Sequence, residues 1–293
     1  MKICPAVCSL RLLGMVLSLA SPQILPAEPI VQSGQTIAFL GDSITQYGAA
    51  HPSGYVRLVE SGLKANGIEV KVIGAGISAH KSNQMLERLQ QDVLDKKPTL
   101  MTLSCGVNDV WHGAKGVSLE DYKKNITEIV DRCAAAGVKV VILTATPIRE
   151  NDNENNQKLA GYNAFLKQLA TERKLPLADL SAAMWAELNK PTHPRPPGDF
   201  LTVDGVHMNP LGNEIMAMGV LEAFGLDAAQ MTKAREVWLT QPVAIRAEGQ
   251  VTKAEWEKIV AVAAQQKKPA SAVLGEALAG ALKTMASPQT SEH

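Results

Sequence analysis

Short apolar runs alternate with longer amphipathic stretches along most of the chain. The runs hold four to six residues, and glycine, proline or an amphipathic stretch follows each of them. This length and these boundaries are typical of buried strands. The predicted strands are Thr36–Leu40, Glu69–Ile73, Leu100–Leu103, Val138–Leu143 and Pro176–Leu180. The fourth run is the most β-branched, which favours a central place in a sheet.

The stretches between and after these strands have the apolar spacing of amphipathic helices. The predicted helices are Tyr55–Ala65, Ser82–Leu94, Leu119–Ala136, about Lys158–Arg173, and one from near Asn209 to near Gly225. Pro210 occupies a favourable first-turn position of the last of these. Strands that alternate with helices need crossover connections, which give a parallel sheet covered on both faces. We therefore predict a three-layer α/β/α sandwich.

The C-terminal part of the chain has no strand pattern. Thr252 and Glu255 form a capping-box pattern for a helix that extends to about Ala264. Ser271–Ala286 is a second helical pattern, rich in alanine. We predict a main domain over residues 28–228 and a helical extension over residues 229–293.

The first 27 residues resemble an export signal. Lys2 and Arg11 give a positive start, and Leu12–Ala20 is an apolar run followed by small residues and helix breakers. The run is shorter than the roughly 20 apolar residues that span a bilayer. Cleavage fits after Ala20 or after Ala27, and we favour the second. We expect an exported protein, periplasmic or secreted, without a stable membrane span after signal removal; an uncleaved N-terminal anchor is the alternative.

Charge and cysteine content narrow the classes of function. The 293 residues include 29 basic and 29 acidic ones, and no basic cluster stands out, which argues against a nucleic-acid partner. Cys105 and Cys133 are the cysteines outside the predicted signal. Export would permit a disulfide, but one strand cysteine and one helix cysteine favour two free, buried thiols. Metal-ligand spacing is absent from the sequence, so we expect no metal. The oligomeric state stays open.

Glycine and small polar residues follow three successive predicted strands. The segments are Gly41-Asp42-Ser43, Gly74-Ala75-Gly76 and Gly106-Val107-Asn108-Asp109. The carboxyl ends of parallel strands share one edge of the sheet, where ligands bind. Glycine lets backbone N–H groups approach a ligand, and Asn108 adds a side-chain amide. Such donors, converging without a cation, suit an oxyanion hole.

Ser43 supplies a hydroxyl at this edge and needs a base to act as a nucleophile. Asp204 precedes His207 by three residues, and both lie just before a predicted helix. A carboxylate at that spacing can bond Nδ1 of the imidazole and leave Nε2 facing the serine. The pair predicts a Ser-His-Asp arrangement.

The three segments after the strands and the pair of Asp204 and His207 form four sequence blocks. In this order the blocks resemble the SGNH (GDSL-like) hydrolase family, across about Ile30 to Gly225. The resemblance implies that Ser43 is the nucleophile, that His207 is its base and that Asp204 orients the base. It implies an oxyanion hole made by the N–H groups of Ser43 and Gly76 and by Asn108 Nδ2. It also implies catalysis without a metal or organic cofactor.

The second block departs from the family pattern. Where the family often has Asn-x-Gly and a further glycine three residues on, this chain has Gly74 and Ala79, and His80 replaces a small polar residue. We expect a changed cleft shape and an intact oxyanion hole. His80 is expected to be a solvated residue at a helix start. Trp111 either lines the cleft or packs under its loop.

The predicted reaction is hydrolysis of an ester through an acyl-serine intermediate. The loops are mostly short, and the long one, Lys190–Leu201, is rich in proline and not apolar, so no apolar lid is evident. This favours short acyl groups, above all acetyl, on a small-molecule or carbohydrate ester. The alternatives are a lipid hydrolase of the lysophospholipase or thioesterase type and a non-catalytic binding module.

Overall fold

The five predicted strands form one parallel sheet. The computed structural model describes Met1 and residues 29–190, 200–243 and 252–286. Within these ranges the strand order is β2-β1-β3-β4-β5. The strands are β1 (Thr36–Gly41), β2 (Lys71–Gly76), β3 (Leu100–Ser104), β4 (Lys139–Leu143) and β5 (Leu177–Ala178). The predicted parallel sheet is thereby confirmed.

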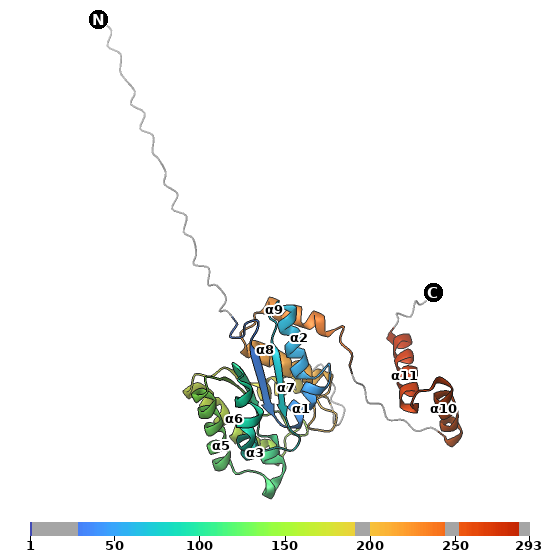
Figure 1. Ribbon diagram of the computed structural model, residues 1–293, viewed down its shortest axis with the longest axis horizontal. Helices are drawn as coiled ribbons and strands as arrows, with labels where there is room; N and C mark the ends of the chain where they lie inside the picture. The colour runs from blue at the N-terminus through green and yellow to red at the C-terminus, as the bar shows by residue number, and fades with distance from the viewer. Residues whose placement is uncertain (2–28, 191–199, 244–251, 287–293) are drawn as a thin grey trace. The chain divides into compact units, whose positions relative to one another are not determined.

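Helices cover both faces of this sheet (Figure 1). One layer contains α3 (Ser82–Asp92), α5 (Leu119–Ala135) and α6 (Glu154–Glu172), with the short α4 (Val107–Trp111) against α6. The other contains α1 (Ser43–Ala50), α2 (Tyr55–Ala65), α7 (Leu180–Leu188), α8 (Pro210–Ala223) and α9 (Ala228–Trp238). The predicted three-layer sandwich is confirmed.

Several element boundaries differ from the sequence prediction. β2 begins two residues later than expected and includes Gly74 and Gly76, so these glycines belong to the strand and do not end it. Helix α6 begins at Glu154 because the Asn153 side chain accepts hydrogen bonds from the N–H groups of Asn155 and Asn156. Helices α1, α4, α7 and α9 were not predicted; the first two are short and lie directly beside the strand ends.

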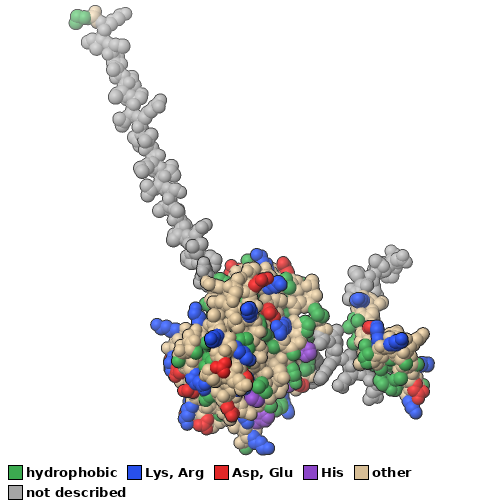
Figure 2. Space-filling view, in the orientation of Figure 1, with side chains coloured by type: hydrophobic (Ala, Val, Ile, Leu, Met, Phe, Trp, Pro, Cys, Tyr) green, Lys and Arg blue, Asp and Glu red, His purple; other side chains and the backbone are tan. Residues whose placement is uncertain are grey.

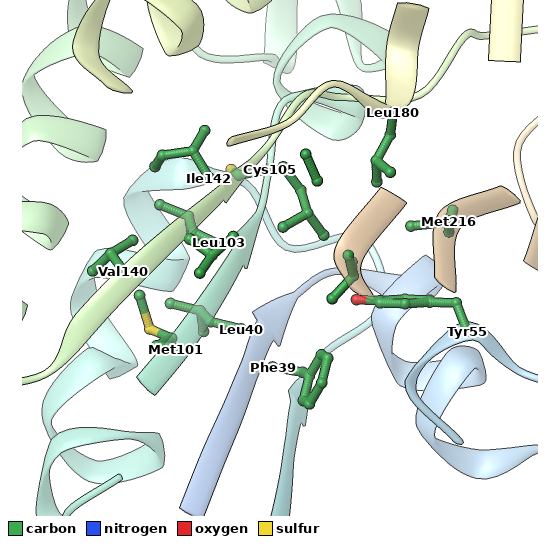
Figure 3. Packing of buried hydrophobic residues seen from close by; sticks show 14 of the residues in the cluster. Phe39, Leu40, Tyr55, Met101, Leu103, Cys105, Val140, Ile142, Leu180 and Met216 are labelled. Atoms are coloured by element: carbon green, nitrogen blue, oxygen red, sulfur yellow. The ribbon is translucent and has the colours of Figure 1, made fainter. Parts of the chain in front are cut away.

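The core lies on both faces of β1, β3 and β4. Phe39, Leu40, Met101 and Leu103 are at most 1% exposed, and side chains from facing helices close over them (Figure 3). The ring of Tyr55 on α2 meets Phe39 edge to face, with 6.1 Å between ring centroids. Burial on two faces explains why these strands are uninterrupted apolar runs in the sequence.

Both cysteines outside the predicted signal are buried free thiols, as expected. Burial raises the pKa of Cys133 to about 11 and that of Cys105 well above its ordinary value. Neither thiol is a reactive thiolate at neutral pH.

Helix α9 belongs to the first of two compact units. Trp238 is 8% exposed, and its Nε1 donates to the carbonyl oxygen of Leu58 on α2 at 2.9 Å. The second unit contains α10 (Lys253–Gln266) and α11 (Ala270–Ala286), and Thr252 caps α10 in the predicted capping box. The boundary therefore falls after α9, later than the expected position between residues 228 and 229.

Charged side chains of both signs intermingle on the face shown in Figure 2. In the described part of the chain, no helix is both long enough and apolar enough to cross a membrane. The predicted signal over residues 1–27 and most of the proline-rich loop lie outside the described residues.

Candidate active site

Ser43 lies at the first position of α1, directly beyond the end of β1. Asp42 is the N-cap, and its Oδ1 accepts a hydrogen bond from the N–H of Ile44 at 2.9 Å. A Cβ atom on Gly41 would lie 2.0 Å from Thr45 Oγ1, so a side chain there would prevent this tight turn. The turn places the Ser43 hydroxyl at the carboxyl edge of the sheet, at the positive end of a helix.

A turn 164 residues later brings His207 to this hydroxyl. His207 Nε2 lies 2.8 Å from Ser43 Oγ, and His207 Nδ1 lies 2.6 Å from Asp204 Oδ2. Asp204 Oδ1 accepts hydrogen bonds from the N–H groups of Val206 and His207 at 3.0 and 2.8 Å. The three predicted residues thus form a continuous hydrogen-bonded chain.

The hydrogen bonds to Asp204 favour its charged form. Partial burial alone would raise the pKa of this carboxyl, but the bonds from His207 and Val206 outweigh burial and hold the pKa below its ordinary value. Asp204 is therefore ionised at neutral pH. An ionised carboxylate at Nδ1 fixes the imidazole tautomer that presents an unprotonated Nε2 to the serine.

Tyr47 is a contact that the sequence analysis missed. It follows Ser43 by four residues on α1, and its ring centroid lies 5.0 Å from that of His207. The i, i+4 spacing places both residues on one face of the helix. Because α1 was not predicted, this signal went unused.

The predicted oxyanion donors gather around the first turn of α1. Asn108 lies on α4, and its Nδ2 donates to Asp42 Oδ2 at 3.2 Å and to the carbonyl oxygen of His80 at 3.3 Å. Gly76 is paired with Gly41 in the sheet register. A Cβ on Gly76 would lie 2.2 Å from the backbone nitrogen of Gln46, so only glycine fits against α1.

Asp42 has a second role besides capping the helix. Burial raises its pKa to about 6. Its Oδ1 holds the serine turn, and its Oδ2 accepts from the Asn108 amide. The structural role expected for Asp42 is borne out, with the added function of orienting a predicted oxyanion donor.

The departures in the second block have visible consequences. Ala79 has a φ of 62°, the left-handed region that glycine tolerates best. His80 is half-buried, whereas the sequence analysis expected a solvated residue. Its Nδ1 accepts from Arg88 Nε at 3.2 Å, and burial, followed by the charge of Arg88, lowers its pKa. His80 therefore lies beside Asn108, whose amide donates to its carbonyl oxygen.

Residues after β4 anchor the turn that carries Asp204 and His207. The Glu150 carboxylate accepts hydrogen bonds from the N–H groups of Phe200 and Leu201 and from Thr202 Oγ1, at 2.8, 2.7 and 2.7 Å. The sequence analysis missed this carboxylate, because a contact between residues 50 positions apart leaves no periodic signal.

The arrangement suits acyl transfer. A hydroxyl bonded to an imidazole, which is bonded to a carboxylate, is the geometry of an activated serine. Amide donors lie beside it, where negative charge would develop on a carbonyl oxygen.

A sequence profile of the GDSL-like lipase/acylhydrolase family matches residues 39–215, which is more than half of the chain. The chain belongs to this family. The matched range begins in β1 and ends in α8, so it includes every residue of the candidate site.

Two relatives align with this chain, one over most of the catalytic unit and the other over part of it. An acetylxylan esterase of Geobacillus stearothermophilus is 28% identical over 217 residues, which are 67% of this chain and 97% of that protein. Esterase TesA of Pseudomonas aeruginosa is 30% identical over 112 residues, 38% of this chain and 54% of that protein. The GDSL-like chain is a carboxylic ester hydrolase.

Solved structures agree with the fold. The crystal structure of the acetyl xylan esterase AlAXEase has a TM-score of 0.59 and 31% identity, covering 64% of this chain and 98% of that one. Axe2, an acetylxylan esterase from Geobacillus stearothermophilus, has a TM-score of 0.61 and 27% identity, covering 67% and 97%.

Proposed function

We propose that this GDSL-like hydrolase removes short acyl groups, foremost acetyl, from carbohydrate esters. The observation that carries the proposal is the hydrogen-bonded chain from Ser43 through His207 to Asp204. Similarity to an acetylxylan esterase over 67% of the chain supports the choice of acyl group and of substrate class.

In this mechanism Ser43 Oγ attacks the ester carbonyl carbon as His207 Nε2 takes the hydroxyl proton. The oxyanion is bound by the N–H groups of Ser43 and Gly76 and by Asn108 Nδ2. The tetrahedral intermediate collapses, the C–O bond to the alcohol breaks, and His207 protonates the leaving alcohol. A water, deprotonated by His207, then hydrolyses the acyl-serine. Asp204 stays ionised and stabilises the imidazolium in both halves.

A lipid or thioester substrate is the second candidate. The lipase activity named in the GDSL-like lipase/acylhydrolase family, whose profile the chain matches, supports a lipid ester. The alignment with the acetylxylan esterase favours the carbohydrate ester. A site kept only for binding would not need the complete hydrogen-bonded chain, which argues against a non-catalytic module.

Hydrolysis of p-nitrophenyl esters from acetate to decanoate tests this proposal, with Ser43→Ala as the control. We expect the highest kcat/KM with acetate and nearly complete loss of turnover in the variant, because triad members act as a unit. Highest activity on long chains would replace the carbohydrate ester with a lipid. Turnover that survives in Ser43→Ala would refute the assignment of the nucleophile.

We further propose that residues 1–27 direct export to the periplasm or the medium. The positive start and the apolar run support this. An uncharacterised lipoprotein of Bacillus subtilis, YqeF, is 25% identical over 105 residues, 35% of this chain and 42% of that protein. Intact-mass measurement of the expressed protein should find an N-terminus at Glu28. A full-length mass in the cytoplasmic fraction would contradict export.

A further inference from the structure

Arg149 lies between the two elements that build the candidate site. Its backbone N–H donates to the carbonyl oxygen of Gly205, between Asp204 and His207, at 2.7 Å. Its guanidinium carbon lies 5.4 Å from the ring centroid of Trp111, which is on α4 three residues after Asn108. The side chain therefore lies at the rim of the site, with the oxyanion-hole element on one side and the triad turn on the other.

The backbone of this segment is held in an uncommon conformation. Arg149 and Glu150 both have left-handed φ values, 60° and 51°. This conformation is unfavourable for a residue other than glycine, and such strain persists only where surrounding contacts impose it. Asn156 provides these contacts from α6, because its Oδ1 accepts from the N–H of Ile148 at 2.8 Å and its Nδ2 donates to the carbonyl oxygen of Ile148 at 2.7 Å. Arg149 is thus positioned by the fold.

The guanidinium of Arg149 has no acceptor within the described ranges. The other arginines there each donate to an oxygen: Arg57 to Glu60, Arg88 to Asp92, Arg132 to Gln90, Arg173 to Asp131 and Arg235 to Glu214. The carboxylate of Glu150, the next residue, accepts hydrogen bonds from residues 200–202. The carboxylate of Asp204, across the turn, is bonded to His207. An exposed, positioned guanidinium keeps its N–H donors available.

Trp111 restrains the orientation of the Arg149 guanidinium. The half-buried indole offers its face to the guanidinium, and a cation–π contact of this kind restrains the plane of the cation without using its N–H donors. A restrained planar fork matches a carboxylate, which accepts two parallel hydrogen bonds from it. The ligand that this site fits best is therefore an anion with carboxylate geometry.

We propose that Arg149, held on Trp111, binds a carboxylate on the sugar portion of the ester, so that the preferred substrate is an acetylated acidic sugar of the uronic acid type. The inference rests on the proposed deacetylation. An acetyl group is uncharged, so a carboxylate of the substrate that is bound beside the site must belong to the alcohol portion of the ester.

Two substrates that differ in one group test this inference. We would compare a mono-O-acetylated methyl glucoside with the corresponding methyl glucuronide, in which a carboxylate replaces the C6 hydroxymethyl group. The wild-type enzyme should show a kcat/KM about ten- to hundredfold higher for the acidic ester, as expected for a charge-assisted hydrogen bond. Arg149→Gln should bring this ratio close to one, and Arg149→Lys should retain part of it.

Arg173→Gln is the matched control. Arg173 also is an exposed arginine, but it lies just before β5, where the sheet strands begin, and pairs with Asp131. The control should keep the wild-type ratio. Because the ratio is taken within each variant, partial loss of folded protein does not affect it.

The outcomes separate this inference from the function on which it rests. Equal rates on the two sugars in the wild type, or a preference that survives in Arg149→Gln, would overturn the carboxylate subsite while p-nitrophenyl acetate is still hydrolysed. No hydrolysis of p-nitrophenyl acetate or of either sugar ester would refute the deacetylase itself.

Discussion

Individual contacts around Ser43 show why this position can hold a reactive hydroxyl. Gly41 and Gly76 leave no space for a Cβ, since each lies against the first turn of α1. Asp42 caps that turn and accepts from Asn108. At the scale of single residues, the site therefore depends on two positions without side chains and on one buried carboxylate.

Replacement of Asn108 with alanine tests the oxyanion hole. The variant should lose about 10²- to 10³-fold in kcat with little change in KM, because the amide bonds the oxyanion and not the ground-state ester. Steady-state kinetics with p-nitrophenyl acetate would measure this. Gln168→Ala, at an exposed amide on α6 that donates to Glu172, serves as a control for loss of a helix amide. A wild-type kcat in Asn108→Ala would remove Asn108 from the mechanism.

The buried carboxyl of Asp42 predicts a pH dependence of stability. Its pKa in the folded protein, about 6, exceeds its ordinary value of 3.8, so the folded state binds this proton more tightly than the unfolded state. Its contribution to the free energy of unfolding is therefore complete below about pH 4 and is lost as the pH rises through about 6. A pKa difference of about two units corresponds to a change of about 3 kcal/mol in the free energy of unfolding.

Asp42→Asn should remove that dependence. Between pH 4 and pH 7, the variant should gain stability relative to the wild type by about 2 kcal/mol, whatever its stability at pH 4. Urea unfolding at a series of pH values would measure the difference. Asp121→Asn, at a fully exposed carboxyl whose pKa is lowered by its bond from Ser118, should leave the profile in this window unchanged. A constant difference between Asp42→Asn and wild type would contradict the prediction.

Among the structural elements, the triad turn depends on a segment far away in the sequence. Residues 200–207 are bonded to the segment after β4 through the Glu150 carboxylate and the Arg149 N–H. Thr202 Oγ1, which donates to Glu150, also accepts from the N–H of Gly205. The position of His207 relative to Ser43 is therefore set partly by the end of a neighbouring strand.

Glu150→Gln should loosen the triad turn. In the glutamine an N–H₂ group replaces one of the two carboxylate oxygens and faces a donor, so at least one of the three bonds is lost. We expect about a 10- to 100-fold loss in kcat with a smaller change in KM, because misplacement by about 1 Å has that effect. Glu154→Gln, at an exposed carboxyl in the first turn of α6, is the matched control. A drop in thermal stability with unchanged kcat would show that Glu150 is only structural.

On the scale of the whole molecule, the chain divides into a catalytic unit and a pair of C-terminal helices. Helix α9 belongs to the catalytic unit, since Trp238 is buried against α2 and bonds to Leu58. Helices α10 and α11 contact each other and form the second unit.

Truncation after Val243 should leave the kcat, the KM and the thermal midpoint of the catalytic unit unchanged, because no core residue of that unit is removed. Truncation after Asp227, which also removes α9, should destabilise the protein by at least about 3–5 kcal/mol, the usual cost of deleting one buried tryptophan. Activity assays and calorimetry on both proteins would compare them. A loss of activity on removal of α10 and α11 alone would assign them a part in catalysis.

The sequence alone predicted the sheet, the main helices and the set of Ser43, His207 and Asp204 that the structure brings together. Strands buried on both faces appear as apolar runs, and capping residues mark helix ends, so these features are visible within a few positions. The spacing of Asp204 and His207 is equally local. Ser43 was identified because it follows a strand, and the shared edge of parallel strands implied that distant motifs meet.

Only the tertiary structure revealed which distant side chains hold the site in place. The bond from Arg149 to the triad turn, the three bonds of Glu150 and the packing of Trp238 each join residues at least 50 positions apart. Such contacts leave no periodicity and no local motif. Short α1 and α4 were likewise hidden, because helices of five to eight residues form through packing against the sheet and not through their own propensity.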